Sequence, residues 1–185
     1  MAHEFRKREE EDELIKRFEE SLKKHSADFF DLDAYETIID HYLFRAKYKK
    51  ALIAVNLAIN LYPFSSELIP LKAQILSHLE KYDEALELLE QAKNLHPHDV
   101  EVYLSIGSIL ALQSKYDEAI DRYEEALTFA EEDVDEIHYN IGLAYQSTEK
   151  YDEAIASYKR AIELNINHEG ALYELAFCLD VVGQL

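Results

Sequence analysis

The chain has 185 residues, and its 38 Asp and Glu against 19 Lys and Arg give it a formal net charge of -19 at pH 7. Such a field repels nucleic-acid phosphates and anionic membrane surfaces, so we expect no nucleic-acid partner and favour basic or neutral ones. The hydrophobic fraction of 48% suits a packed core, while only 4 Gly and 3 Pro favour helices joined by short turns.

The ends of the sequence and its single thiol bear on location. No run of about 18 apolar residues occurs, so we expect no membrane insertion. The first residues are charged throughout and lack the apolar region of a signal peptide. Cys178 is the single cysteine, which excludes an internal disulfide framework. A cytoplasmic location is the resulting expectation.

Residues 1–30 are predicted to contain a charged N-terminal helix, over roughly residues 4–25. Its apolar stripe consists of Leu14, Ile15, Phe18 and Leu22. We expect this helix to cap the array that follows. The alternatives are a degenerate second helix of a preceding repeat and an interaction arm.

A short motif recurs along the rest of the chain. It reads YKKAL from Tyr48, YDEAL from Tyr82, and YDEAI from Tyr116 and Tyr151, at steps of 34, 34 and 35 residues. Apolar residues at fixed offsets after each motif trace one face of a helix. Recurring alanines indicate that two helices approach closely, because a larger side chain there would overpack the contact at about 1–3 kcal/mol. The alanines within the motifs are Ala51, Ala85, Ala119 and Ala154.

A second helical pattern precedes each motif. Gly107 and Gly142 both lie 12 residues before the motif alanine. Because glycine costs roughly 1 kcal/mol against alanine inside a helix, its recurrence indicates close backbone packing. Each unit is therefore predicted to be two antiparallel helices, joined by a tight turn just before the tyrosine.

The ends of these helices have sequence signals of their own. Pro63 and Pro97 are expected to stop second helices. The predicted N-caps of the following first helices are Ser66, Asp99 and Asp133, and Glu136 completes a capping box with Asp133.

Taken together, these offsets resemble the tetratricopeptide repeat over roughly residues 33–185. The resemblance implies an all-α, right-handed α-solenoid of tetratricopeptide-type hairpins with an N-terminal capping helix. The array is expected over residues 31–185, in units of about 32–65, 66–99, 100–133 and 134–167, with the first helix of a truncated fifth unit at 168–185. The next motif alanine would fall at position 188, so we expect a fragment of a longer array, or a homodimer formed through the uncapped C-terminal helix.

Candidate chemistry is sparse. Cys178 lies among apolar residues and is expected to be a buried structural thiol, and His96 and His98 flank Pro97 in a predicted surface turn. No carboxylate or cysteine spacing completes a metal site, and no glycine-rich phosphate loop occurs. We therefore expect no catalytic residues, no metal, no cofactor and no enzymatic activity.

The resemblance implies that a peptide lies along a concave face lined by the first helices of the hairpins. It places an acidic part of this groove near Glu36 and Asp40, followed by an apolar and aromatic part. We therefore expect a basic and apolar partner segment instead of a carboxylate tail. In the alternative, Tyr139, Leu143, Tyr173 and Phe177 only fill gaps between hairpins or contact the missing helix. The expected groove residues are Glu36, Asp40, Gln74, Leu104, Ser108, Tyr139, Leu143, Tyr173 and Phe177.

The function expected from these features is that of a protein–protein interaction scaffold or adaptor. Two alternatives stay open. One is a regulatory or targeting domain of a larger enzyme or of a secretion or assembly machine. The other is self-association through the open C-terminal end.

Overall fold

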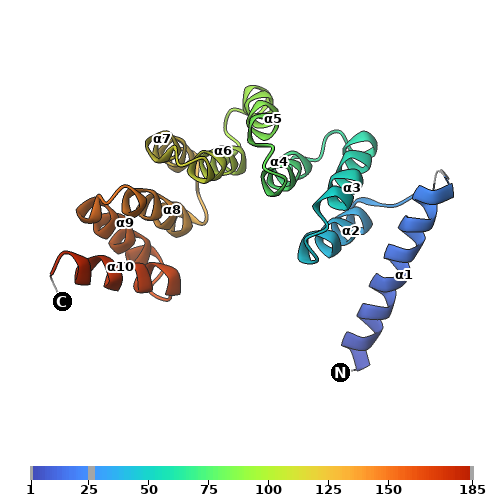
Figure 1. The fold of residues 1–185 in the computed structure, drawn as a ribbon, viewed down its shortest axis with the longest axis horizontal. Helices are drawn as coiled ribbons and strands as arrows, with labels where there is room; N and C mark the ends of the chain where they lie inside the picture. Colours follow the sequence, from blue (N-terminus) through green and yellow to red (C-terminus); the bar gives the residue numbers. More distant parts are fainter. Residues whose placement is uncertain (1, 25–27, 184–185) are drawn as a thin grey trace. The chain divides into compact units, whose positions relative to one another are not determined.

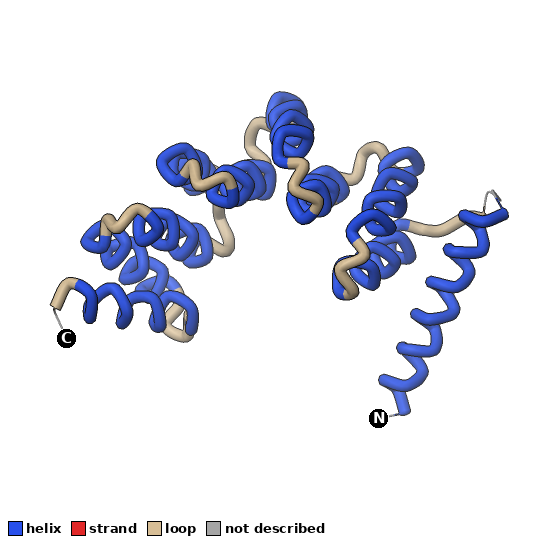
Figure 2. Tube along the Cα trace, in the orientation of Figure 1, coloured by secondary structure: helices blue, strands red, loops and turns tan. Residues whose placement is uncertain are grey.

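The computed structural model describes residues 2–24 and 28–183, with side chains from residue 10 onward, and these residues form ten α-helices and no strand (Figures 1 and 2). The chain divides into two compact units, Met1–Lys81 and Tyr82–Leu185, which we call the N-terminal and C-terminal units. The N-terminal unit contains α1 (Ala2–Lys24), α2 (Leu32–Phe44), α3 (Tyr48–Leu61) and α4 (Leu68–His78). The C-terminal unit contains α5 (Tyr82–Leu95), α6 (Val100–Leu112), α7 (Tyr116–Leu127), α8 (Val134–Ser147), α9 (Tyr151–Leu164) and α10 (Glu169–Val181).

The second helices α3, α5, α7 and α9 all begin at the predicted tyrosine. The residue two positions before each tyrosine is in the left-handed region, and none of the four is glycine. In α6, the bonds Lys115 N→Leu110 O and Ser114 N→Ala111 O, both 2.9 Å, close the helix end around this residue. The left-handed residues are Ala46 (φ 51°), Glu80 (φ 59°), Ser114 (φ 60°) and Glu149 (φ 60°), and Gly183 (φ 71°) takes the same place after α10.

The core of the N-terminal unit confirms the apolar stripe predicted for the first helix. Phe18 of α1 is 1% exposed, and its ring packs edge-on against Phe30 at 5.6 Å and Tyr35 at 6.2 Å between centroids. Glu19, the next residue of α1, makes polar contacts with the first hairpin: it accepts hydrogen bonds from Tyr42 Oη at 3.2 Å and from Lys50 Nζ at 2.5 Å. The helix α1 is therefore held on the first hairpin by both apolar and ionic contacts.

In the C-terminal unit, glycine and tyrosine form complementary pairs within two hairpins. A Cβ atom on Gly107 would lie 2.5 Å from Tyr123 Cε1, and one on Gly142 would lie 2.4 Å from Tyr158 Cε1. The tyrosine ring thus occupies the space that any side chain of the first helix would need. This confirms that the repeated glycine serves close packing, and the motif alanines of all four hairpins are likewise fully buried.

The predicted helix ends are confirmed in part. The helices α3 and α5 end at Leu61 and Leu95, just before the predicted prolines, and Asp99 Oδ1 accepts a hydrogen bond from Glu101 N at 3.1 Å as the N-cap of α6. Ser66 is not the N-cap of α4, so that prediction is wrong. Pro70 has no N–H to reach the Ser66 carbonyl, so the first helical bond is Leu71 N→Glu67 O, and Glu67 takes the cap position.

The capping box predicted before α8 is also wrong. Asp133 occupies the N-cap position, but its backbone is left-handed, at φ 53° and ψ 25°, and its side chain makes no capping hydrogen bond. An N-cap side chain reaches the helix N–H groups from an extended backbone, which Asp133 does not have.

Candidate binding surface

The expected surface residues of the N-terminal unit lie on its two first helices. Glu36 of α2 is half-buried, whereas Asp40 of α2 and Gln74 of α4 are exposed. Burial raises the pKa of the Glu36 carboxyl, and the negative charges of Glu67, Asp33 and Asp40 raise it further. Carboxylates therefore crowd this part of the surface and would be stabilised by an incoming positive charge.

The expected surface residues of the C-terminal unit lie on α6, α8 and α10. The aromatic residues on α10 are the exposed ones among the large side chains: Tyr173 is 73% exposed and Phe177 is 47% exposed. These two residues are one helical turn apart and so share one side of α10. The remaining four are Leu104, Tyr139 and Leu143, all half-buried, and Ser108, which is exposed.

Tyr139 packs between α8 and the start of α10. Its ring centroid lies 4.8 Å from that of His168, and a Cβ atom on Gly170 would lie 3.0 Å from Tyr139 Cζ. Leu143 also packs against the core cluster of this end of the chain. The structure therefore places Tyr139 and Leu143 at the joint between two hairpins, and leaves Tyr173 largely and Phe177 about half open to solvent.

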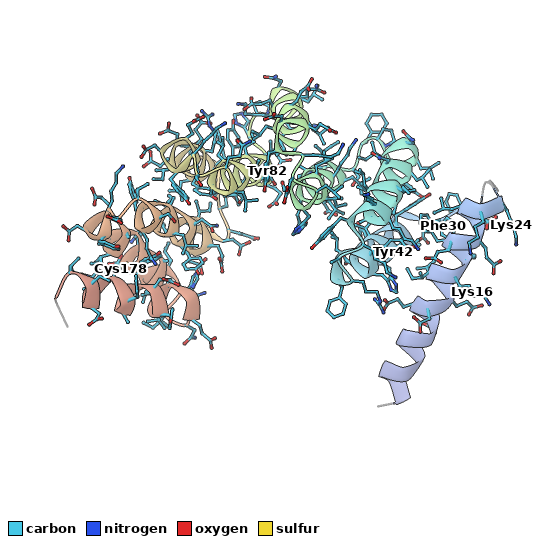
Figure 3. All side chains as sticks on the ribbon, viewed as in Figure 1. Lys16, Lys24, Phe30, Tyr42, Tyr82 and Cys178 are labelled. Atoms are coloured by element: carbon cyan, nitrogen blue, oxygen red, sulfur yellow. The ribbon has the colours of Figure 1, made fainter. Side chains whose placement is uncertain are left out.

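The side chain of Gln146 joins α8, α9 and α10. Its Oε1 accepts hydrogen bonds from Tyr158 Oη at 2.6 Å and from Cys178 Sγ at 3.3 Å, and its Nε2 donates to Glu174 Oε2 at 2.8 Å. Cys178, labelled in Figure 3, is fully buried as the sequence predicts. Burial and the charge of Glu174 raise the pKa of this thiol, which keeps it protonated and able to donate.

Glu174 is the residue of this surface that sequence reasoning missed. It lies one position after the offset occupied by Tyr173, so the repeat register does not mark it. Its signal is spatial, because it depends on Gln146, 28 residues earlier, reaching across from α8. No offset within a single repeat reports such a contact.

Charge is distributed unevenly between the two units, and the C-terminal unit is the more acidic one. Residues 82–185 contain 23 Asp and Glu but only 6 Lys and Arg, whereas residues 1–81 contain 15 and 13. The first helices α6, α8 and α10 contain no Lys or Arg at all. Their acidic residues are Glu101, Asp135, Glu136, Glu169, Glu174 and Asp180.

The described residues contain no cluster of three or more His, Cys, Asp and Glu side chains that could hold a metal ion. His96 and His98 are both exposed, and His98 packs against the Phe129 ring at 4.7 Å between centroids. Within residues 2–24 and 28–183, no helix has the length and apolar character needed to cross a bilayer.

Comparison with protein families gives two matches, both to models of the tetratricopeptide repeat. One covers residues 67–132 and the other residues 136–168, and together they span more than half of the chain. Comparison with curated protein sequences gives no match.

Solved structures with similar folds are all-α helical repeat solenoids. The crystal structure of YrrB, described as a TPR protein with an unusual peptide-binding site, is 25% identical, with a TM-score of 0.60 over 76% of this chain and 72% of that one. TTC0263 of Thermus thermophilus, a thermophilic TPR protein, is 21% identical, with a TM-score of 0.73 over 95% and 94%. PilW, a type IV pilus biogenesis factor, is 21% identical, with a TM-score of 0.71 over 82% and 70%.

Proposed function

The chain belongs to the tetratricopeptide repeat family, and from this premise we propose that it is an interaction scaffold that binds a peptide or protein segment along its first helices. Repeats of this kind are a fold, so the function has to be sought in the surface that they carry. The similarity to YrrB, a TPR protein with a peptide-binding site, supports peptide binding.

One observation carries the proposal: Tyr173 and Phe177 are exposed side by side on α10. Aromatic side chains provide a large contact area at low entropic cost and are enriched among the residues that dominate binding energy. In the proposed surface, Leu104, Ser108, Tyr139 and Leu143 extend the contact over α6 and α8. On the N-terminal unit, Glu36 and Asp40 form a separate acidic part, and Gln74 adds a polar side chain. Taken separately, the acidic part suits basic side chains of a partner, and the aromatic part suits apolar ones.

The test is selection of peptides from a random display library on the immobilised chain, followed by affinity measurement on variants. We expect Tyr173→Ala combined with Phe177→Ala to weaken the selected peptides by roughly tenfold or more, the scale of losing an aromatic anchor. The matched control combines Phe44→Ala with Phe64→Ala, which removes two rings that are 89% and 98% exposed on the N-terminal unit.

Thermal melts of both double variants should stay close to that of the unmodified chain, because all four side chains are exposed. Equal binding by the unmodified chain and the α10 variant would contradict a role for α10. Failure to select any peptide would contradict the proposal as a whole.

A further inference from the structure

We propose that Glu174, one helical turn before Phe177 on α10, is the residue that selects an arginine side chain in the partner. The inference deepens the proposed function and depends on it, because it names the chemistry that one part of the same surface recognises. The carboxylate supplies the charge, and the neighbouring Phe177 ring supplies a face against which a planar guanidinium lies.

The Glu174 carboxylate is held in place by the protein. It is half-buried, and its Oε2 accepts the 2.8 Å hydrogen bond from Gln146 Nε2. Gln146 is itself fixed, because its Oε1 accepts from Tyr158 and Cys178, which come from two other helices. A carboxylate has about four acceptor positions, so this single bond leaves capacity for a further donor.

A partner can supply that donor. Within the described part of the chain, no Lys or Arg forms an ion pair with Glu174, and α6, α8 and α10 contain neither residue type. Four of the six Lys and Arg residues of the C-terminal unit form ion pairs with acidic residues of the second helices. Their ion pairs are Arg122 with Glu125 at 2.8 Å, Lys150 with Asp117 at 2.9 Å, Arg160 with Glu163 at 2.8 Å, and Lys93 with Glu90 at 2.5 Å.

The neighbouring ring favours arginine over lysine. Glu174 lies three residues and Tyr173 four residues before Phe177, so each of these two side chains is a neighbour of the Phe177 ring on the helix surface. A guanidinium can donate to the carboxylate in its own plane while its face stacks on an aromatic ring, whereas an ammonium acts as a strongly hydrated point charge. This arrangement therefore predicts that the partner residue is basic and that arginine is preferred over lysine.

The experiment uses the complete chain and a resin-bound random heptapeptide library as the probe. The variants are Glu174→Gln, which keeps an acceptor for Gln146 but removes the charge, and the matched control Glu169→Gln, at an exposed glutamate on the same helix. We expect the unmodified chain and the control to enrich arginine at one library position, and Glu174→Gln to lose that enrichment.

A second measurement separates recognition from a structural role. In one captured peptide, the enriched arginine is replaced by citrulline, which is nearly isosteric but neutral. We expect a loss of affinity of roughly tenfold or more for the unmodified chain, as for a charge-assisted hydrogen bond, and less than about twofold for Glu174→Gln. A general loosening of α10 would lower both affinities without changing their ratio.

Two results would overturn the inference while leaving the proposed function intact. One is capture of peptides without any enrichment of arginine, and the other is an equal citrulline effect in the unmodified chain and in Glu174→Gln. Capture of no peptide by any form of the chain would overturn the proposed function and this inference together.

Discussion

Gly107 and Gly142 show how a missing side chain can determine the geometry of a hairpin. The ring that fills the space above each glycine belongs to a tyrosine on the second helix. The hydroxyl of that tyrosine makes a polar contact with another side chain of the first helix. Tyr123 Oη lies 3.3 Å from Ser108 Oγ, and Tyr158 Oη donates to Gln146. In the hairpin of α2 and α3, the corresponding positions hold Ile39 and Val55, both fully buried. The size of the side chain on the first helix therefore varies inversely with the size of the side chain that faces it on the second helix.

Substitution of Gly107 tests this complementarity. We expect Gly107→Ala to destabilise the chain by about 1–2 kcal/mol in urea denaturation, because the added Cβ would lie 2.5 Å from the Tyr123 ring. The expected loss is a net value, because the steric cost should exceed the gain of roughly 1 kcal/mol in helix propensity that alanine brings. Combining it with Tyr123→Leu should recover part of the loss, and a double-mutant cycle gives the coupling. Strictly additive effects would show that the ring is free to move away.

The hairpin turns are the elements that repeat most faithfully in the structure. Four of them close around a non-glycine residue with positive φ, although a left-handed backbone costs such a residue about 1 kcal/mol or more. The same closure after α10 uses Gly183, which adopts φ 71° without that cost. The turn geometry is therefore set by the packing of the two helices and not by local preference.

Replacing a left-handed residue with glycine should therefore stabilise the fold. We expect Ser114→Gly to raise the free energy of unfolding by about 0.5–1 kcal/mol, because glycine adopts φ 60° without steric cost. The matched control is Ser105→Gly, in the middle of α6, where the same change should lower stability by about 0.5 kcal/mol or more. Both are measured by urea denaturation, and a loss of stability in Ser114→Gly would indicate that the serine side chain contributes to the turn.

The sequence predicts much of this architecture because the packing repeats. Helix starts at Tyr48, Tyr82, Tyr116 and Tyr151 follow from a motif, and so does the burial of the alanines. The failures are of two physical kinds. The cap at Ser66 fails because Pro70 withholds a single N–H, which residue-type preferences at the cap position do not include.

The second kind concerns contacts between repeats. The repeat register indicates which side of α8 Tyr139 occupies, but not that Gly170 leaves room for its ring. In the same way, the position of Glu174 depends on a glutamine of the preceding hairpin. The sequence period describes positions within one repeat, so it does not predict side-chain contacts between two neighbouring repeats.

Over the whole molecule, charge is segregated between the two units. Residues 82–185 have 17 more acidic than basic residues, and residues 1–81 have 2 more. Like charges at this density repel one another and oppose compaction, and added salt screens the repulsion. Salt should therefore stabilise the C-terminal unit selectively.

Hydrogen exchange measures this effect element by element. Raising NaCl from about 0.02 M to 0.5 M shortens the screening length from roughly 20 Å to about 4 Å. We expect the backbone amides of α7, α8 and α9 to gain protection of about 1 kcal/mol or less, the scale of exposed charge interactions, and those of α2 and α3 to change little. An equal gain in both units would point to a general salt effect and contradict a role for charge segregation.

The absence of Lys and Arg from α6, α8 and α10 also decides which reagents can report on this surface. Trypsin finds no cleavage site within these three helices, and amine-directed dyes and cross-linkers find no attachment point on them. Such reagents modify the turns and second helices instead, for example at Lys115, Lys150 and Lys159. A partner bound along α6, α8 and α10 would therefore escape lysine-based mapping of this chain. Carbodiimide coupling through Glu174 or Asp180 to an amine of the partner would place a covalent mark on the surface itself.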